Sequence, residues 1–266
     1  MCYKFDHDFH IHSKLSSCSN DPEQTTQRIL EYAKKNNLTS VCVTDHFWDK
    51  KVEGASNWYA PQDFDHISQN LPLPKDDEVK FLFGCETELN KFGTVGICKE
   101  TIDKMDFVII PTTHFHMTDY TLSTAQLESP KTRAQAWIDR LGRVLDMDLP
   151  FHKIGIAHLT CQLVFRNDTE KLLETFDLIP TDEMHRLFSK AKNLGVGIEL
   201  NAHDMANAIK NPPLFKPYIA AKECGCKFYV GSDTHHPKDF DMVPDAINTA
   251  TEILGLDERD KFILGI

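Results

Sequence analysis

The sequence predicts an α/β fold, a single β/α barrel, and three observations support this prediction. The chain has 266 residues, 41% of them hydrophobic, and barrels of about 200–250 residues commonly form one domain. Short apolar runs alternate with helical patterns along the chain, an order typical of parallel strands with helices outside them. No internal repeat, low-complexity tract or long linker divides the sequence. We therefore expect residues 1–266 to form one domain.

Seven short apolar runs predict the strands of this barrel. They alternate with helical patterns and are bounded by polar or turn-forming residues. The predicted strands are Lys4–Phe9, Thr39–Thr44, Val79–Cys85, Asp106–Pro111, Lys153–Ala157, Val196–Leu200 and Lys227–Gly231.

Helical patterns lie between the predicted strands. Asp21-Pro22-Glu23 predicts the start of the first helix, because Asp is a common N-cap and Pro fits the first helical position. Ile29, Leu30 and Ala33 follow at helical spacing. Further helices are predicted at Pro61–Asn70, Pro130–Asp146, Thr169–Phe176, Thr181–Asn193, Leu214–Glu223 and Val243–Leu254, and long loops at Trp48–Ala60 and Thr113–Ser129.

Every predicted strand delivers a His, Asp or Glu at or just past its C-terminal end. In a β/α barrel these ends converge on one face, where active sites form. We therefore expect the polar side chains to lie together. In chain order they are Asp8, His10, His12, Asp45, His46, Glu86, His114, His116, His158, Glu199, Asn201, Asp233 and His235.

This set of side chains predicts a metal site, since imidazole and carboxylate groups suit Zn, Mn and Fe. His10 and His12 are two residues apart, so on a strand they point the same way and one ion can bind both. A lone histidine after a strand is more often an ordinary hydrogen-bonded polar group. Glu199 and Asn201 are weaker candidates, because solvated strand ends look the same, and we expect His7 at the surface or behind the ligands.

Composition excludes several classes of protein. The net charge of −11 argues against a basic surface for nucleic acid or membrane, although bound metal ions can reverse the field locally. No apolar run is long enough for a membrane span, and the N-terminus lacks a signal-peptide pattern. The eight cysteines are irregularly spaced, so we expect no disulfide framework and a cytoplasmic location.

The motifs at the strand ends resemble those of the PHP family (polymerase and histidinol phosphatase domains), and the resemblance covers nearly the whole chain. His10-Ile11-His12, Thr44-Asp45-His46 and Asp233-Thr234-His235 match the family's three short motifs. Glu86, His114 and His158 match single residues that follow the third, fourth and fifth strands. The resemblance implies a distorted (β/α)7 TIM-like barrel that holds two or three divalent ions, Zn, Mn or Fe.

The resemblance also implies how the ligands are shared. One ion would take His10, His12, Glu86 and Asp233, and a second would take Glu86, His114 and His158. His46 and His235 would belong to a third ion. The sequence departs from the family at position 18, where Cys18 replaces a histidine. A thiolate can bind zinc, so this site either survives with a changed metal preference or is weak or empty.

The implied activity is that of a metal-dependent phosphoric monoester hydrolase, histidinol-phosphatase-like, in which a metal-activated water attacks phosphorus. Asp233 is the carboxylate best placed to orient that water. Lys14 and His116 are candidate substrate contacts, and the Thr113–Ser129 loop is a candidate for substrate selection. The substrate would be a small phosphomonoester such as histidinol phosphate, a sugar phosphate or a nucleotide, since no basic track exists for a polynucleotide.

Two alternatives stay open at this point. An amidohydrolase also begins with His-x-His, but that class usually places a metal-bridging lysine on a middle strand, where this chain has Glu86 and His114. A regulatory or structural metal-binding module without catalysis is favoured only by Cys18. The sequence does not choose the physiological ester, the metal or the oligomeric state.

Overall fold

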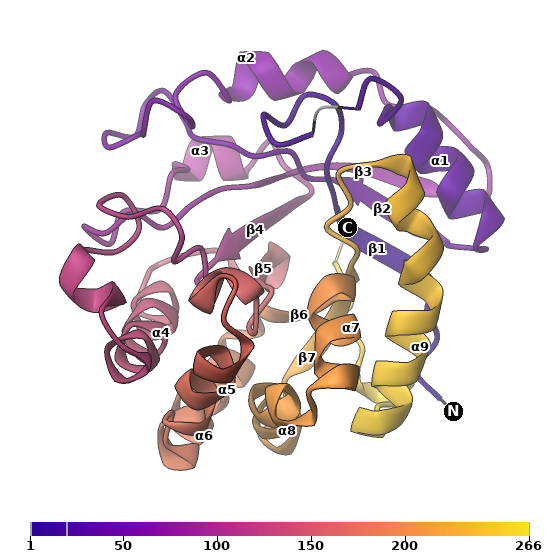
Figure 1. The fold of residues 1–266 in the computed structure, drawn as a ribbon. Coiled ribbons are helices and arrows are strands. Elements are labelled where there is room, and N and C mark those ends of the chain that lie inside the picture. The colour runs from indigo at the N-terminus through magenta and orange to yellow at the C-terminus, as the bar shows by residue number, and fades with distance from the viewer. Residues whose placement is uncertain (1, 20, 266) are drawn as a thin grey trace.

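The computed structural model describes residues 2–19 and 21–265 as a nearly closed ring of seven parallel strands with helices outside it (Figure 1). The strands are joined in chain order, β1 to β7. This is the predicted distorted (β/α)7 TIM-like barrel. The strands are β1 (His7–Ile11), β2 (Ser40–Val43), β3 (Lys80–Glu86), β4 (Phe107–Pro111), β5 (Ile154–Ala157), β6 (Gly197–Asn201) and β7 (Lys227–Gly231).

The predicted strand boundaries agree with the structure except at the first strand. For β2 to β7, neither end differs from the prediction by more than one residue. β1 was predicted at Lys4–Phe9 but starts at His7 and extends to Ile11. His10 therefore lies inside a strand, where neighbouring backbone bonds fix its direction, and not in the loop that follows.

The ring closes where β1 meets β7. The backbone N–H of Asp233 donates to the carbonyl of His10 at 2.7 Å, and that of His12 donates to the carbonyl of Thr234 at 3.2 Å. These two bonds tie the ends of β1 and β7 together just where the first and last predicted motifs lie.

Side chains complete the contact between β1 and β7 lower in the ring. His7 Nε2 accepts from the backbone N–H of Val230 at 3.0 Å, and Asp8 Oδ1 accepts from that of Ser232 at 3.0 Å. His7 is thus buried at 3% exposure in the wall of the barrel. The expectation that His7 lies at the surface or behind the ligands was therefore wrong. Its ring accepts a hydrogen bond from a backbone N–H of β7, a need for an acceptor that the sequence does not reveal.

The helices connect successive strands around the outside of the ring (Figure 1). Most predicted helices are present in the structure. The structure also contains two helices that were not predicted, the short α3 and the longer α7. The helices are α1 (Thr26–Lys35), α2 (Phe64–Ile67), α3 (Lys99–Ile102), α4 (Pro130–Leu145), α5 (Thr169–Asp177), α6 (Thr181–Leu194), α7 (Ala202–Lys210), α8 (Lys216–Glu223) and α9 (Val243–Leu254).

The start of α1 differs from the prediction. Its N-cap is Thr25, whose hydroxyl accepts from the N–H of Arg28, and not Asp21. Residues before it are held by tertiary contacts, since the Gln24 amide donates to the carbonyl of His12 at 2.8 Å. This bond fixes the loop after β1 and delays the helix.

Two apolar layers leave the C-terminal end of the barrel free for a site. A large core lies between strands and helices. A smaller cluster fills the barrel interior and includes Phe9, Phe107, Tyr229 and Phe262. The side chains above this interior plug form the floor of a cavity at the C-terminal ends of the strands.

The described part of the chain contains no helix with the length and apolar character needed to traverse a bilayer. All eight cysteines are free thiols.

Candidate metal centre

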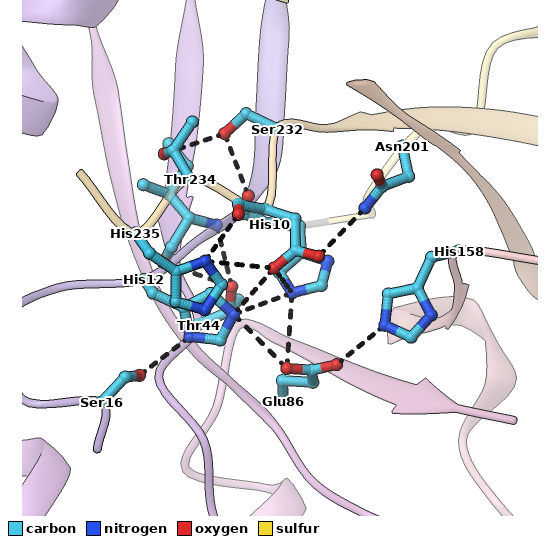
Figure 2. A network of polar contacts seen from close by, with 12 residues as sticks. His10, His12, Ser16, Thr44, Glu86, His158, Asn201, Ser232, Thr234 and His235 are labelled. Atoms are coloured by element: carbon cyan, nitrogen blue, oxygen red, sulfur yellow. Dashed lines mark hydrogen bonds and ion pairs between the residues drawn. The ribbon is translucent and has the colours of Figure 1, made fainter. Parts of the chain in front are cut away.

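The side chains predicted at the strand ends meet at one place. Figure 2 shows His10, His12, Glu86, His158 and His235 pointing toward one another above the barrel interior. They line or adjoin a cavity of about 540 Å³. Three overlapping groups offer ligand atoms within 4.8 Å of one another, namely His10 with His12 and Glu86, Glu86 with His114 and His158, and His12 with Cys18, His46 and His235.

The first group is the most tightly arranged. His10 Nε2 and His12 Nε2 lie 3.1 Å apart, and each is 3.4–3.5 Å from Glu86 Oε2. Asp233 Oδ1 lies 3.4 Å from His10 Nε2 and 3.2 Å from His12 Nε2. Two ring nitrogens and two carboxylate oxygens therefore face one small space.

Glu86 belongs to two of the three groups and lies next to His46 of the third. Its Oε1 lies 3.2 Å from His158 Nε2 and 3.9 Å from His114 Nε2. Its Oε2 lies 3.0 Å from His46 Nδ1, a buried nitrogen without a well-oriented hydrogen bond. The side chain is 1% exposed, so its charge is balanced by these histidines alone or by a cation.

Three of the histidines present Nε2 to the centre because an oxygen acceptor holds the other ring nitrogen. His10 Nδ1 donates to Glu199 at 2.6 Å, and His114 Nδ1 donates to Glu88 at 2.7 Å. His235 Nδ1 donates to the carbonyl of Asp233 at 2.9 Å. Such outer partners fix the tautomer and leave a lone pair on Nε2 in the neutral ring.

Two more histidines have hydroxyl partners that lead to the same tautomer. Ser16 donates its hydroxyl hydrogen to Asp45 at 2.7 Å, so it must accept from His12 Nδ1 at 2.8 Å. Thr113 likewise donates to the carbonyl of His158 and accepts from its Nδ1, both at 2.8 Å. Five inward Nε2 atoms are thus prepared for a proton or a metal.

The carboxylates of the centre favour positive charge on the histidines next to them, whereas burial and the neighbouring histidines lower the pKa of His235 to about 3. Burial lowers the pKa of His12, but its bonds to Asp233 and Glu86 outweigh burial and raise that pKa to about 9. Burial raises the pKa of Glu86, yet the surrounding histidines bring it well below its usual value. Protons and divalent cations compete for such donors. The residues therefore fit a metal in number, type and direction.

Backbone strain marks two of the predicted positions. His158 has φ +26° and Asp233 has φ +55°, a region that residues other than glycine rarely adopt. The N–H of His158 donates to Glu199 at 2.5 Å, and the N–H of Asp233 donates to His10. These bonds hold both residues in conformations that turn their side chains into the centre.

The structure places the other predicted residues as follows. Cys18, His116, Asp233 and His235 line the cavity, and the Asp233 side chain is 22% exposed, unlike that of Glu86. Lys14 is exposed and does not line this cavity, so its role as a substrate contact stays a prediction. Burial raises the pKa of the Cys18 thiol far above its usual value, and Asp233 and Glu86 add to this.

Sequence reasoning gave too little weight to Glu199. It is fully buried and bonds both His10 and the backbone of His158, so it is not a solvated strand end. Its position between Ile198 and Leu200, inside an apolar run, was the available signal.

Sequence reasoning missed the partner of His114. Glu88 is also fully buried, and Arg140 of α4 lies 3.2 Å from its Oε1. Arg140 in turn donates to the carbonyls of Thr112 and Thr121. The Glu88–Arg140 pair therefore joins His114 to α4 and to the loop after β4.

Asp45, the middle residue of Thr44-Asp45-His46, has a role in loop packing. Its carboxylate accepts from the backbone N–H and hydroxyl of Ser13, each at 2.7 Å, and from the hydroxyl of Ser16. Asn70 also donates to it. Asp45 thus holds the loop after β1 and, through Ser16, orients His12.

Two solved structures have a similar fold. The histidinol phosphate phosphatase of Lactococcus lactis subsp. lactis, described as a complex with zinc, L-histidinol and phosphate, is 19% identical, with a TM-score of 0.56 over 92% of this chain and 93% of that one. A candidate histidinol phosphatase of Listeria monocytogenes is 15% identical, with a TM-score of 0.58 over 88% and 96%. Neither a protein-family model nor a curated protein matches the chain. The resemblance to histidinol phosphatases thus holds at the level of the fold.

Proposed function

We propose that this chain is a metal-dependent phosphoric monoester hydrolase of the PHP family, with residues 1–266 as its catalytic domain. The observation that carries the proposal is the convergence of five histidines, each with Nδ1 bonded to an oxygen, on Glu86 and Asp233. The zinc and phosphate of the Lactococcus neighbour support the same chemistry.

The three ligand groups would hold two or three divalent ions. His10, His12, Glu86 and Asp233 suit the first ion. Glu86, His114 and His158 suit the second, with Glu86 between the two. Cys18 would join His46 and His235 at the third. The charge of the cation would lower the pKa of the Cys18 thiol, so that it binds as a thiolate. Zinc fits this mixed nitrogen, oxygen and sulfur set, and manganese or iron fits the first two groups.

Divalent ions bound here supply positive charge for the phosphate oxygens and lower the pKa of a water molecule. The chain's own part is to orient the reactants. Asp233 is the carboxylate with exposed surface in the cavity, so it can accept a hydrogen bond from the attacking water and take its proton. The water oxygen bonds to phosphorus, the ester P–O bond breaks, and the leaving oxygen takes up the proton that Asp233 accepted from the water. His116 lies at the rim, where it can contact the substrate.

The test is hydrolysis of p-nitrophenyl phosphate by the protein loaded with Zn or Mn, before and after treatment with a chelator. We expect turnover that the chelator abolishes and that metal restores. His12→Ala removes a nitrogen shared by two ligand groups and should abolish turnover while circular dichroism shows an intact fold.

His185→Ala is the matched control, because His185 is 43% exposed and pairs with Glu223 at the surface. It should keep full activity. Stoichiometric metal binding without turnover on any phosphomonoester would instead support a module without catalysis. Wild-type turnover by His12→Ala would contradict the centre described above.

A further inference from the structure

The wall of the cavity above the proposed ligands is built from three loops. Trp58 and Tyr59 come from the loop after β2, and Met117 comes from the loop after β4. Cys161 and Leu163 follow β5. Their side chains are aromatic, aliphatic or sulfur-containing, so the wall offers mainly apolar surface to whatever group is attached to the phosphate.

The wall also lacks charge. Of the described residues that line the cavity, none is Lys or Arg, and the acidic ones are Glu86 and Asp233, which face the histidines. Arg166 beyond the loop is exposed and does not line the cavity. An ammonium or a second anionic group on the substrate would lose water here without gaining an ion-pair partner, which is costly in a partly buried site.

Trp58 is the most informative residue of the wall. The residue is 36% exposed, whereas Trp48 and Trp137 are almost completely buried. It packs edge-on against His46, with ring centroids 4.9 Å apart, and against Tyr59, with centroids 4.7 Å apart. These contacts orient the indole beside the proposed metal centre and leave surface on which a flat ligand can stack.

We propose that the substrate is a phosphomonoester of an uncharged alcohol with an aromatic or similarly flat apolar group, and that Trp58 selects it. This substrate class rests on the proposed phosphatase function. It differs from the amine-bearing histidinol phosphate, because the wall, as far as its residues are described, has no carboxylate free to pair with an ammonium.

The first test measures binding without turnover. The metal-loaded protein is titrated by calorimetry with phenylphosphonate, methylphosphonate and 2-aminoethylphosphonate, which share one head group and differ in the attached group. We expect phenylphosphonate to bind about tenfold more tightly than methylphosphonate, because the ring buries more apolar surface. We expect 2-aminoethylphosphonate to bind no better than methylphosphonate.

Variants then assign the effect to the wall. Trp58→Ala should remove the advantage of phenylphosphonate and leave methylphosphonate unchanged, and Trp58→Phe should keep most of it. Phe92→Ala is the control, because Phe92 is 77% exposed and lies outside the cavity lining. Leu163→Asp should add a partner for the ammonium and favour 2-aminoethylphosphonate.

Activity separates this inference from the proposed function. We expect kcat/KM for phenyl phosphate to exceed that for histidinol phosphate by at least about tenfold. A higher kcat/KM for histidinol phosphate, or tighter binding of 2-aminoethylphosphonate through cation–π contact with Trp58, would overturn the inference but not the phosphatase. Loss of turnover on every ester, with the phosphonate preference intact, would overturn the phosphatase and the ester as its substrate, but not the selection of a flat apolar group by Trp58.

Discussion

Glu199 illustrates how a residue outside the proposed ligands can determine the geometry of the centre. One of its carboxylate oxygens accepts from His10 Nδ1 and the other from the backbone N–H of His158. Asn201 also donates to it. A single buried carboxylate of β6 therefore orients one histidine on β1 and fixes the strained backbone of another after β5.

Glu199→Gln should weaken metal binding about 10- to 100-fold, the usual effect of losing a partner behind a ligand. The glutamine amide can accept from only one of the two donors and directs its own N–H groups at the other. The measurement is a competitive zinc titration with elemental analysis. Glu223→Gln is the control, since Glu223 makes a comparable bond to His185 at the surface, and equal losses in both variants would contradict this role.

Cys18→His should raise the occupancy of the third proposed site. The thiol resists ionisation here because burial and nearby carboxylates raise its pKa, whereas a neutral imidazole needs no such ionisation to bind a cation. Elemental analysis after loading with manganese should show more metal per chain than in the wild type. An unchanged ratio would show that position 18 does not limit this site.

The sequence was sufficient to predict the proposed ligands but not what holds them. His10, Glu86, His158 and the others were found because each follows an apolar run, and a barrel brings such positions together. Glu199 meets His10 across 189 residues, and a carboxylate buried behind a histidine looks the same in sequence as one in solvent. The difference is made by tertiary packing alone.

At the scale of the element, β7 can only approach β6 and β1 as it does because position 231 has no side chain. A Cβ on Gly231 would lie 1.9 Å from Glu199 Oε1 and 2.6 Å from His10 Cβ. The strand therefore requires glycine there for close approach, one residue before it turns toward Asp233.

Gly231→Ala should lower the free energy of unfolding by about 1–3 kcal/mol through overpacking, and it should weaken metal binding by displacing Glu199. Gly142→Ala in α4 is the matched control with the opposite sign. Its Cβ would meet Leu187 at an ordinary 3.5 Å, and alanine in a helix is favoured by up to about 1 kcal/mol. Urea unfolding of both variants measures the difference, and an equally stable Gly231→Ala would contradict the close approach.

Helix boundaries show where local signals are overruled. Asp21-Pro22 has the features of a helix start, yet Gln24 is held by the carbonyls of His12 and Thr234, and the helix begins after it. α7 was missed although Asn201 caps it, its side chain accepting from the N–H groups of His203 and Asp204. Asn201 is also the last residue of β6, so no loop separates β6 from α7. The apolar pattern alone therefore did not show where the strand ends and the helix begins.

At the scale of the whole molecule, Asp204 joins three parts of the barrel. From α7, its Oδ2 accepts from the backbone of Thr160 after β5 at 2.8 Å and from the hydroxyl of Tyr218 in α8 at 3.0 Å. Burial raises its pKa from 3.8 to about 6. The folded state thus binds a proton on Asp204 more strongly than the unfolded state does.

Asp204→Asn should therefore change how stability depends on pH. In the wild type, the free energy of unfolding should fall as pH rises from about 4 to 6, because the proton on Asp204 is lost over this range. A pKa shift of about two units corresponds to a fall of roughly 3 kcal/mol. The amide keeps an acceptor oxygen and does not titrate. The free energy of unfolding of the variant, minus that of the wild type, should increase across this range, and a constant difference would contradict the raised pKa.

The join between β1 and β7 has a consequence for synthesis of the chain. Ser232 follows His10 by 222 residues, so the ribosome releases the first His-x-His motif long before the strand that completes its surroundings. While residues 87–232 are being translated, the nascent chain carries His10, His12 and Glu86 without Asp233 and His235. The centre is therefore completed only when β7 emerges, and a cation bound there would join β1 to β7 across more than 200 residues.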